Sequence, residues 1–393
     1  MILYSLKSLS TNPKLRFKQF FFLFICWNLL SCQRKTKVGN PIEVALSSDH
    51  LKIRRVMDSI ANYAVQIKFS QIERSNGEIS FKDYEYQVDS NTYFYPASTV
   101  KFPIALLALS KLNTIENMDR NTRFYVEGDT VETTIRREIE KIFAVSDNQA
   151  NNRLFEFLGQ DYINQELQKI LDGPVRISHR LSTPNSDEIT SKPLIVYLND
   201  STTHMLSGSI NTSAEPLRME AIEKGVGYYE EDSLMLGSFD FSLKNYYPID
   251  TQHEFLKKVM FSNHFPDDEK LKLTEEQLTF VHNAMHTVPK KMGYDETTYY
   301  DGYCKFFMYG DTKKEIPKHI KIYNKVGDAY GTLTDCAYVH DTKNDIEFLL
   351  TATVMVNKNK IFNDNTYEYD EIGFPFLAEL GREIYANELA RKK

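Results

Sequence analysis

Residues 94–109 read FYPASTVKFPIALLAL and join an extended aromatic start to an almost wholly apolar run. A run of this length without a polar face is typical of a helix that protein surrounds on all sides. Ser98 and Lys101 fall in its first turn, and residues three apart lie on one face of a helix. The serine hydroxyl and the lysine amine are therefore predicted to touch.

Ser98 and Lys101 have the chemistry of a nucleophile and its base. A serine hydroxyl is a weak nucleophile until a base takes its proton, and an amine in an apolar environment has a lowered pKa that suits it to this task. Backbone N–H groups at the helix start would face a developing oxyanion. The alternative is that Ser98 caps the helix and Lys101 extends to solvent. The pair alone does not decide between these interpretations.

Two further motifs follow in the chain. Ser146-Asp147-Asn148 lies between two predicted helices, where Ser146 and Asp147 could instead be simple helix caps. Lys325-Val326-Gly327 comes at the end of the strand-like residues 319–325. In this order the three motifs resemble the S-x-x-K, S-D-N and K-T-G set of class A β-lactamases and penicillin-binding proteins.

The resemblance covers residues 47–391 apart from one insertion, and it implies a mixed α/β (α+β) fold. An antiparallel sheet flanked by N- and C-terminal helices would be joined to an all-helical subdomain. The run after Lys325, through Asp335, also resembles the class A version with one residue fewer. The resemblance at the third motif thus extends beyond Lys325 and Gly327.

The resemblance also implies a role for each motif residue. Ser98 would be acylated, Lys101 would be its general base, and Ser146 would pass a proton to the leaving nitrogen. The remaining implied roles are substrate binding by Asn148, Lys325 and Gly327, and an oxyanion hole made by the backbone N–H groups of Ser98 and Asp328. The expected activity is acyl transfer by a serine hydrolase without a cofactor or metal ion. His282 and His286 lack the glutamate of a zinc-protease motif and are interpreted as ordinary helix residues.

Two departures from the family pattern affect the expected activity. Val326 replaces a hydroxyl residue that binds the substrate carboxylate, and counting from Arg180-Leu181 places Asn185 where class A enzymes carry the deacylating glutamate. Asp187 and Glu188 lie nearby. Turnover of β-lactams or related amides is therefore expected to be slow. The alternatives are a penicillin-binding, D,D-peptidase-like enzyme and a non-hydrolytic sensor of β-lactams or peptidoglycan.

The first 31 residues have the pattern of a lipoprotein signal peptide. Basic residues precede the short apolar run at 20–30, which is followed by Ser31-Cys32. Cys32 is the expected lipidation site, and the alternative is a plain signal peptide with an incidental cysteine. The protein is thus expected to be a lipid-anchored membrane protein on the periplasmic or surface side of the cell envelope.

Charge and cysteine content narrow the possible partners. Removing the leader takes away Lys7, Lys14, Arg16 and Lys18 and no acidic residue, so the net charge falls from −7 to −11. Nucleic acid is therefore not expected as a partner. The expected partners are a small-molecule amide and, through the anchor, a membrane. An oxidising compartment permits a Cys304–Cys336 disulfide without requiring it.

The domain organisation follows from the element pattern. A tether is expected at 32–48 and the hydrolase domain at 49–391, with its helical subdomain at about 98–290. An insertion with a small sheet or hairpin is expected at about 193–247, beside the cleft. A helix at 49–63, a hairpin over 64–88, three strands over 320–356 and a final helix at about 374–391 complete the prediction.

Overall fold

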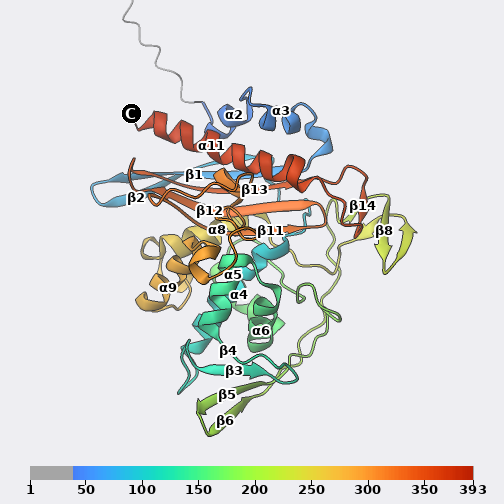
Figure 1. The fold of residues 1–393 in the computed structure, drawn as a ribbon, viewed down its shortest axis with the longest axis vertical. Coiled ribbons are helices and arrows are strands. Elements are labelled where there is room, and N and C mark those ends of the chain that lie inside the picture. Colours follow the sequence, from blue (N-terminus) through green and yellow to red (C-terminus); the bar gives the residue numbers. More distant parts are fainter. Residues whose placement is uncertain (1–38, 393) are drawn as a thin grey trace, which may run out of the picture. The chain divides into compact units, whose positions relative to one another are not determined.

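The computed structural model describes residues 39–392, and Figure 1 shows its fold. The predicted signal peptide, Cys32 and the start of the predicted tether lie outside the described residues. Within 39–392, no helix has the length and hydropathy that a membrane span requires.

A five-stranded antiparallel sheet runs through the molecule in the order β11-β12-β13-β1-β2. The first strand of the chain therefore pairs with the last long one, as predicted, with Phe69 opposite Leu350. The expected hairpin over 64–88 is confirmed as β1–β2. The strand bounds are β1 (Val65–Ser75), β2 (Glu78–Tyr86), β11 (Ile320–Ala329), β12 (Thr332–Asp341) and β13 (Ile346–Met355).

Both faces of this sheet are covered by helices (Figure 1). Neighbouring residues on β13 point to opposite faces, so Leu349 packs in one apolar core while Phe348 and Leu350 pack in the other. This two-sided burial explains why β13 reads as a nearly continuous apolar run.

The terminal helices cover one face of the sheet. The last helix has the predicted bounds, and its apolar side contributes Phe376, Leu380 and Ile384 to the core beneath it. A short helix at Pro41–Leu46 packs against it, with Ile42 fully buried. The elements of this layer are α2 (Pro41–Leu46), α3 (Leu51–Met57), the 3₁₀ turn η1 (Ile60–Asn62) and α11 (Phe374–Arg391).

The structure corrects the predicted start of the domain. Residues 41–46 fall in the segment expected to be a tether, yet they are helical and buried against α11. Pro41 at the first helical position and the Asn40 side chain, which accepts from the Ile42 N–H at 3.0 Å, start this helix. The single helix expected over 49–63 is in turn split into α3 and η1.

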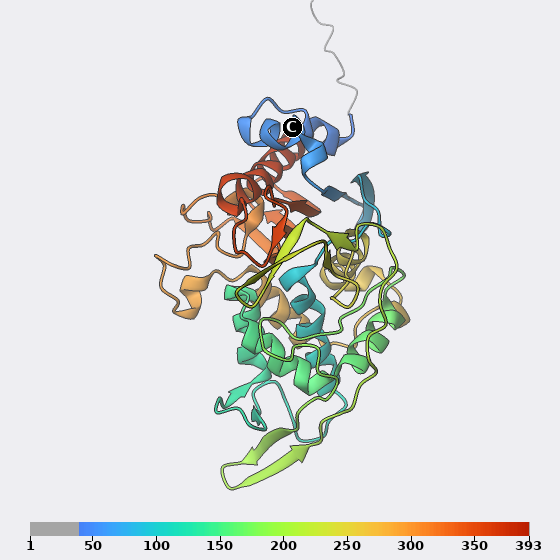
Figure 2. The ribbon, with the colours of Figure 1, turned by 90° about the vertical axis from the view of Figure 1, so that its right-hand side faces the viewer.

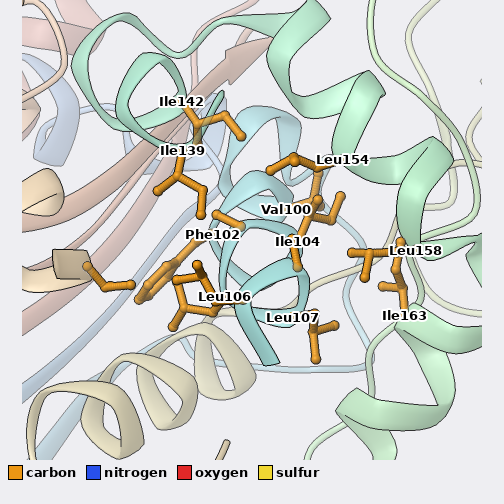
Figure 3. Packing of buried hydrophobic residues seen from close by; sticks show 14 of the residues in the cluster. Val100, Phe102, Ile104, Leu106, Leu107, Ile139, Ile142, Leu154, Leu158 and Ile163 are labelled. Atoms are coloured by element: carbon orange, nitrogen blue, oxygen red, sulfur yellow. The ribbon is translucent and has the colours of Figure 1, made fainter. Parts of the chain in front are cut away.

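The other face of the sheet carries the helical part of the molecule. Its centre is the apolar helix that begins at Lys101, whose Ile104, Leu106 and Leu107 are buried among Ile139 and Leu154 of the neighbouring helices (Figure 3). The helices are α4 (Lys101–Leu112), α5 (Ile135–Val145), α6 (Asn148–Leu158), α7 (Gln160–Ile170), α8 (Ile249–Met260) and α9 (Glu275–His286). Thr274 and Gln277 form a capping box at the start of α9.

The subdomain is not all-helical, in contrast to the prediction. Residues 123–126 form a strand that pairs with the start of the predicted insertion, with Phe124 opposite Val196. The resulting four-stranded sheet lies at the end of the helical part farthest from the main sheet (Figure 1). Its strands are β3 (Arg123–Val126), β4 (Thr133–Thr134), β5 (Leu194–Asn199) and β6 (Thr202–Leu206).

The rest of the insertion contains short strands near the other end of the helical part. In Figure 2 the hairpin of β8 and β9 (yellow-green) lies beside the segment that follows β13 (red), and β8 pairs with that segment. These strands are β7 (Glu223–Lys224), β8 (Gly227–Glu230), β9 (Ser233–Leu236), β10 (Phe239–Asp240) and β14 (Ile361–Phe362). The remaining short elements are η2 (Ala97–Val100), η3 (Ser262–His264), η4 (Asp267–Glu269), η5 (Pro289–Met292), α10 (Phe306–Tyr309) and η6 (Tyr369–Gly373).

A buried histidine between α8 and the sheet makes stability depend on pH. His253 is 1% exposed, and its ring contacts the Ser70 hydroxyl at 2.7 Å and the Thr351 hydroxyl at 2.9 Å. Burial, with the nearby Lys257 charge, lowers the pKa of His253 to about 3. A histidine in the unfolded chain titrates near pH 6.5. Between about pH 6.5 and 3 the unfolded state therefore binds a proton that the folded state does not bind. The contribution of His253 to stability is fully present above about pH 6.5 and is lost as the pH falls towards 3.

We expect urea unfolding at pH 7, 5.5 and 4.5 to show a falling free energy of unfolding. One histidine contributes up to about 1.4 kcal/mol per pH unit in this window. The His253→Gln variant, which keeps hydrogen-bonding groups at the site, should show a shallower slope. A slope unchanged by the substitution would rule His253 out as its source.

Candidate active site

The predicted nucleophile lies at the edge of a cavity between the sheet and the helices. Ser98 is on the 3₁₀ turn η2, directly before α4, and lines a cavity of about 490 Å³. Ala97 before it has a φ of +47°, a conformation that non-glycine residues seldom adopt. The turn therefore constrains the backbone next to Ser98, directly before the buried helix α4.

Lys101 is completely buried at the start of α4. Its Nζ lies 2.7 Å from the Asn148 Oδ1 and 3.2 Å from the Ser146 Oγ, and it also contacts the Ser146 carbonyl oxygen. Burial and the nearby Lys325 charge hold the pKa of Lys101 well below its ordinary value. The alternative in which Lys101 extends to solvent is therefore wrong.

The predicted direct contact between Ser98 and Lys101 is not formed as a hydrogen bond. Within residues 39–392 the Ser98 hydroxyl has no hydrogen-bond partner, because the connection between α5 and α6 holds the lysine amine. A neutral amine that donates to the Ser146 carbonyl and to Asn148 keeps its lone pair available to accept a proton. This is the state that a general base requires.

Ser146 joins two lysines. It ends α5 in a left-handed conformation with a φ of +59°, which turns the chain sharply before α6. The Lys325 Nζ donates to its Oγ at 2.8 Å, and the Lys101 Nζ lies 3.2 Å from the same oxygen. Once the Lys101 amine has accepted a proton, its Nζ can donate to the Ser146 Oγ, so a proton has a continuous path through the three side chains.

The motif Ser146-Asp147-Asn148 also has a structural role. Asp147 caps α6, because its Oδ1 accepts from the Ala150 N–H at 2.8 Å, so the capping interpretation holds for this residue. Asn148 lines the cavity, and its oxygen accepts from Lys101. Its side-chain NH₂ remains available to donate to a substrate carbonyl.

Lys325 lies on β11 and is 2% exposed. Burial lowers its pKa to about 8, and its Nζ also donates to the Val326 carbonyl at 2.7 Å. Val326 is itself 2% exposed, so it belongs to the core under the sheet.

Gly327 allows β11 to lie against η2, the turn that carries Ser98. A Cβ at this position would meet the Pro96 oxygen at 2.7 Å and the Ser98 nitrogen at 2.8 Å. The strand continues through Asp328, which lines the same cavity as Ser98. The backbones of Ser98 and Asp328 are thus brought to one place, as the predicted oxyanion hole needs, although that role stays a prediction.

The loop at 180–188 differs from the expectation. Asn185, counted as the deacylating position, lines a neighbouring cavity with Glu188, whereas Leu181 lines the cavity of Ser98. Asn152 on α6 fixes Leu181 by accepting from its N–H at 2.9 Å and donating to its C=O at 2.8 Å. The position counted along the sequence therefore does not lie at the cavity of Ser98, because the count assumed a loop of fixed shape. Neither Asp187 nor Glu188 lines the cavity of Ser98.

One wall of the cavity consists of residues for which the sequence predicted no role. Tyr95 and Tyr330 line it together with Asn363, Asn365, Tyr367 and Tyr369 from the segment after β14. The signal in the sequence is the dense run of asparagine and tyrosine at 363–369, which has no helical or strand period.

Other residues considered from the sequence have structural roles. Cys304 and Cys336 are both free, buried thiols, so the permitted disulfide is not formed. His282 contacts the Val259 carbonyl oxygen on α8. Among residues 39–392 there is no group of histidine, cysteine and carboxylate side chains that could hold a metal ion.

The buried amines of Lys101 and Lys325 meet at the Ser146 hydroxyl, near the turn that carries Ser98, on a mixed fold of antiparallel sheet and helices. Residues 52–205 match the family model described as Beta-lactamase enzyme family. This match agrees with the resemblance of the three motifs to β-lactamase- and penicillin-binding-protein-like serine hydrolases.

Solved structures of similar proteins have low sequence identity to this chain. The β-lactamase from Sphaerobacter thermophilus is 12% identical with a TM-score of 0.49, over 89% of this chain and 97% of that one. The β-lactamase from Streptosporangium roseum is 14% identical with a TM-score of 0.49, over 86% and 97%. A PBP-A L158E mutant in an acyl-enzyme complex with penicillin G is 13% identical with a TM-score of 0.46, over 88% and 95%. No curated protein matches the chain.

Proposed function

We propose that this protein is a class A β-lactamase-like serine hydrolase that forms an acyl-enzyme at Ser98 with β-lactams or related amides. The observation that carries the proposal is the position of Ser146 between the amines of Lys101 and Lys325, beside the cavity that Ser98 lines. Two buried amines around one hydroxyl are costly to maintain, and proton transfer during acylation gives them a purpose.

In the proposed reaction the Ser98 Oγ attacks the amide carbonyl carbon while its proton moves to the Lys101 amine. The carbonyl oxygen becomes an oxyanion that the backbone N–H groups of Ser98 and Asp328 stabilise. The C–N bond then breaks, and the leaving nitrogen takes a proton through Ser146. Lys325 offers a positive charge to a substrate carboxylate. The product of this half-reaction is an ester at Ser98.

A fluorescent penicillin followed by a denaturing gel tests this proposal. The wild-type protein should become labelled, and Ser98→Ala should not. Ser110→Ala is a matched control, because Ser110 is a buried serine near the C-terminal end of α4 and does not line the cavity. Labelling that survives in Ser98→Ala would refute the assignment of the nucleophile.

A penicillin-binding enzyme that releases its acyl group slowly is the second candidate. Among the residues within 39–392 that line the cavity, only Asp328 carries a carboxylate, and this favours slow release. Deacylation by the family mechanism needs a carboxylate that deprotonates water on the acyl face. The non-hydrolytic sensor would share the acylation step but release nothing.

We propose that the protein acts in the cell envelope, anchored through a lipid on Cys32. The support is the basic start, the short apolar run and Leu29-Leu30-Ser31-Cys32 in the sequence. In a bacterial host, Cys32→Ala should move the protein from the membrane fraction to the supernatant after lysis. Retention of the variant in membranes would contradict the anchor.

A further inference from the structure

The two ends of the folded domain lie side by side. The Asn387 side-chain nitrogen, in the last turns of α11, lies 3.5 Å from the Pro41 carbonyl oxygen at the start of α2. The Ser48 hydroxyl, just after α2, donates to Glu383 of α11 at 2.6 Å. Figure 1 shows α2, α3 and α11 together on the face of the main sheet opposite to the helical part. Both ends are therefore on the other side of the sheet from α4, the helix that Ser98 precedes.

The proposed anchor is close to this edge in the sequence. Asn40 follows Cys32 by eight residues, and eight residues span at most about 28 Å when fully extended. A domain of this size has a radius of gyration of about 20 Å and is about 50 Å across. If Cys32 is anchored as proposed above, the far side of the domain cannot touch the bilayer while Asn40 stays within that reach.

The helix α3 has a buried and an exposed side. Ile53 and Val56 are fully buried, whereas Leu51 and Arg55, four residues apart and so on one face of the helix, are both exposed. Leu51 is 82% exposed, and Val44 on the preceding helix α2 is 46% exposed. Single exposed apolar residues are common on protein surfaces. These two are notable for their position, because they lie on the helices directly after Asn40.

Positive charge gathers at the same edge, although the mature chain as a whole is acidic. The segment 33–39 contains three basic residues and no acidic one, and residues 391–393 are all basic. Residues 41–58 balance three acidic side chains with three basic ones: Glu43, Asp49 and Asp58 with Lys52, Arg54 and Arg55. The excess of positive charge where the two chain ends meet matches an anionic lipid surface.

Two of these cations are available to a lipid head group. The Arg55 guanidinium donates to the Glu371 backbone oxygen at 2.9 Å, and among residues 39–392 it pairs with no carboxylate. Lys392 lies 3.0 Å from the carboxylate of Asp345, which is 87% exposed. An exposed ion pair of this kind is weak, so a phosphate can replace the carboxylate.

We propose that the outer side of α2 and α3, together with the end of α11, docks on an anionic lipid bilayer. We call this surface the α2–α3 face and define it by Val44, Leu51, Arg55 and Lys392. The two apolar side chains enter the head-group region, and the two cations meet lipid phosphates. Docking turns the helical part of the molecule away from the bilayer. The inference rests on the proposed anchor, but it concerns the orientation of the domain, which a tether alone does not fix.

Tryptophan fluorescence tests the docking, because the single tryptophan of the sequence, Trp27, belongs to the predicted leader. In the mature protein Leu51→Trp therefore reports on one position. The lipidated variant is placed in vesicles of phosphatidylglycerol and phosphatidylcholine. Its emission should shift to shorter wavelength and should be largely lost when brominated phosphatidylcholine is used. Leu198→Trp is the matched control, because Leu198 is 47% exposed on β5, and it should show neither change.

The contribution of charge is tested in the Leu51→Trp background. Arg55→Gln combined with Lys392→Gln should reduce the quenching by brominated lipid in anionic vesicles. Lys272→Gln, at an exposed lysine shortly before α9, is the matched control and should leave the quenching unchanged. Quenching should also be weaker in vesicles of phosphatidylcholine alone. Equal quenching in both kinds of vesicle would contradict the role of the cations.

Separate outcomes decide the docking and the anchor. Emission of lipidated Leu51→Trp that is the same in brominated and unlabelled vesicles would overturn the docking. So would a shift that grows with protein concentration in the mature Cys32→Ala chain without lipid, because a second copy would then cover the α2–α3 face. Mass spectrometry of Cys32 decides the anchor. If Cys32 carries no lipid, the anchor is wrong, and the same spectra of the mature chain with anionic vesicles still decide the docking.

Discussion

Replacing Lys101 with methionine should lower the rate of Ser98 acylation by about 10² to 10⁴, the usual contribution of a positioned general base. Methionine keeps the length and apolar character of the buried side chain but cannot accept a proton. The rate constant for labelling by a fluorescent penicillin, measured under pseudo-first-order conditions, reports this step directly.

The matched control for this substitution is Lys111→Met on the same helix. Burial lowers the pKa of Lys111 to about 8, and its Nζ donates to the Phe157 carbonyl at 2.6 Å, but it does not line the cavity. We expect this variant to be acylated at the wild-type rate. Equal acylation rates in Lys101→Met and the wild type would show that another group takes the Ser98 proton.

The pH profile of acylation offers a second check on Lys101. The base must be neutral to accept a proton, so the rate should rise with pH through the pKa of Lys101. Burial and the Lys325 charge lower this pKa, and the rise should therefore be complete well below pH 10.5. A profile that follows an ordinary lysine would contradict the role.

Turnover of a chromogenic cephalosporin should show a burst of about one equivalent followed by a slow phase. The groups proposed for acylation lie at or beside the cavity, whereas the loop at 180–188 supplies no carboxylate to the cavity for deacylation. We expect Leu181→Glu to speed the slow phase by about 10² or more, because a positioned base typically contributes this much. The Asn152 side chain should hold the new glutamate in place through the backbone of residue 181.

Asn185→Glu is the control for this substitution, since Asn185 lines the neighbouring cavity. Its slow phase should match that of the wild type. Stopped-flow measurement of both variants decides between the two positions. Rapid linear turnover by the wild type without a burst would show that another residue activates the water.

Much of the fold could be predicted because its signals are local. The apolar helix after Ser98 and the final helix at 374–391 follow from residue type and period alone. The three motifs and their order could be identified from the sequence, and in the structure Lys101 and Lys325 both contact Ser146. Local signals did not reveal that the short β3 pairs with β5, because that pairing joins residues about 70 apart and depends on the folded core.

The details of the site were harder to predict for a similar reason. Lys101 faces Ser98 by helical spacing, yet its amine bonds to Ser146 and Asn148, which the path of the chain between α5 and α6 places there. Counting to Asn185 assumed a loop of fixed shape. The cavity wall at 363–369 has no period that could locate it, and its position depends on pairing with the insertion.

The most direct test of the central claim is peptide mass spectrometry of the protein after brief exposure to penicillin G. The proposed function predicts that a single peptide, the one containing Ser98, gains the full mass of one penicillin molecule, as expected when an amide opens onto a hydroxyl without loss of atoms. An unmodified Ser98 peptide, with the adduct on another residue or nowhere, would contradict the acyl-enzyme.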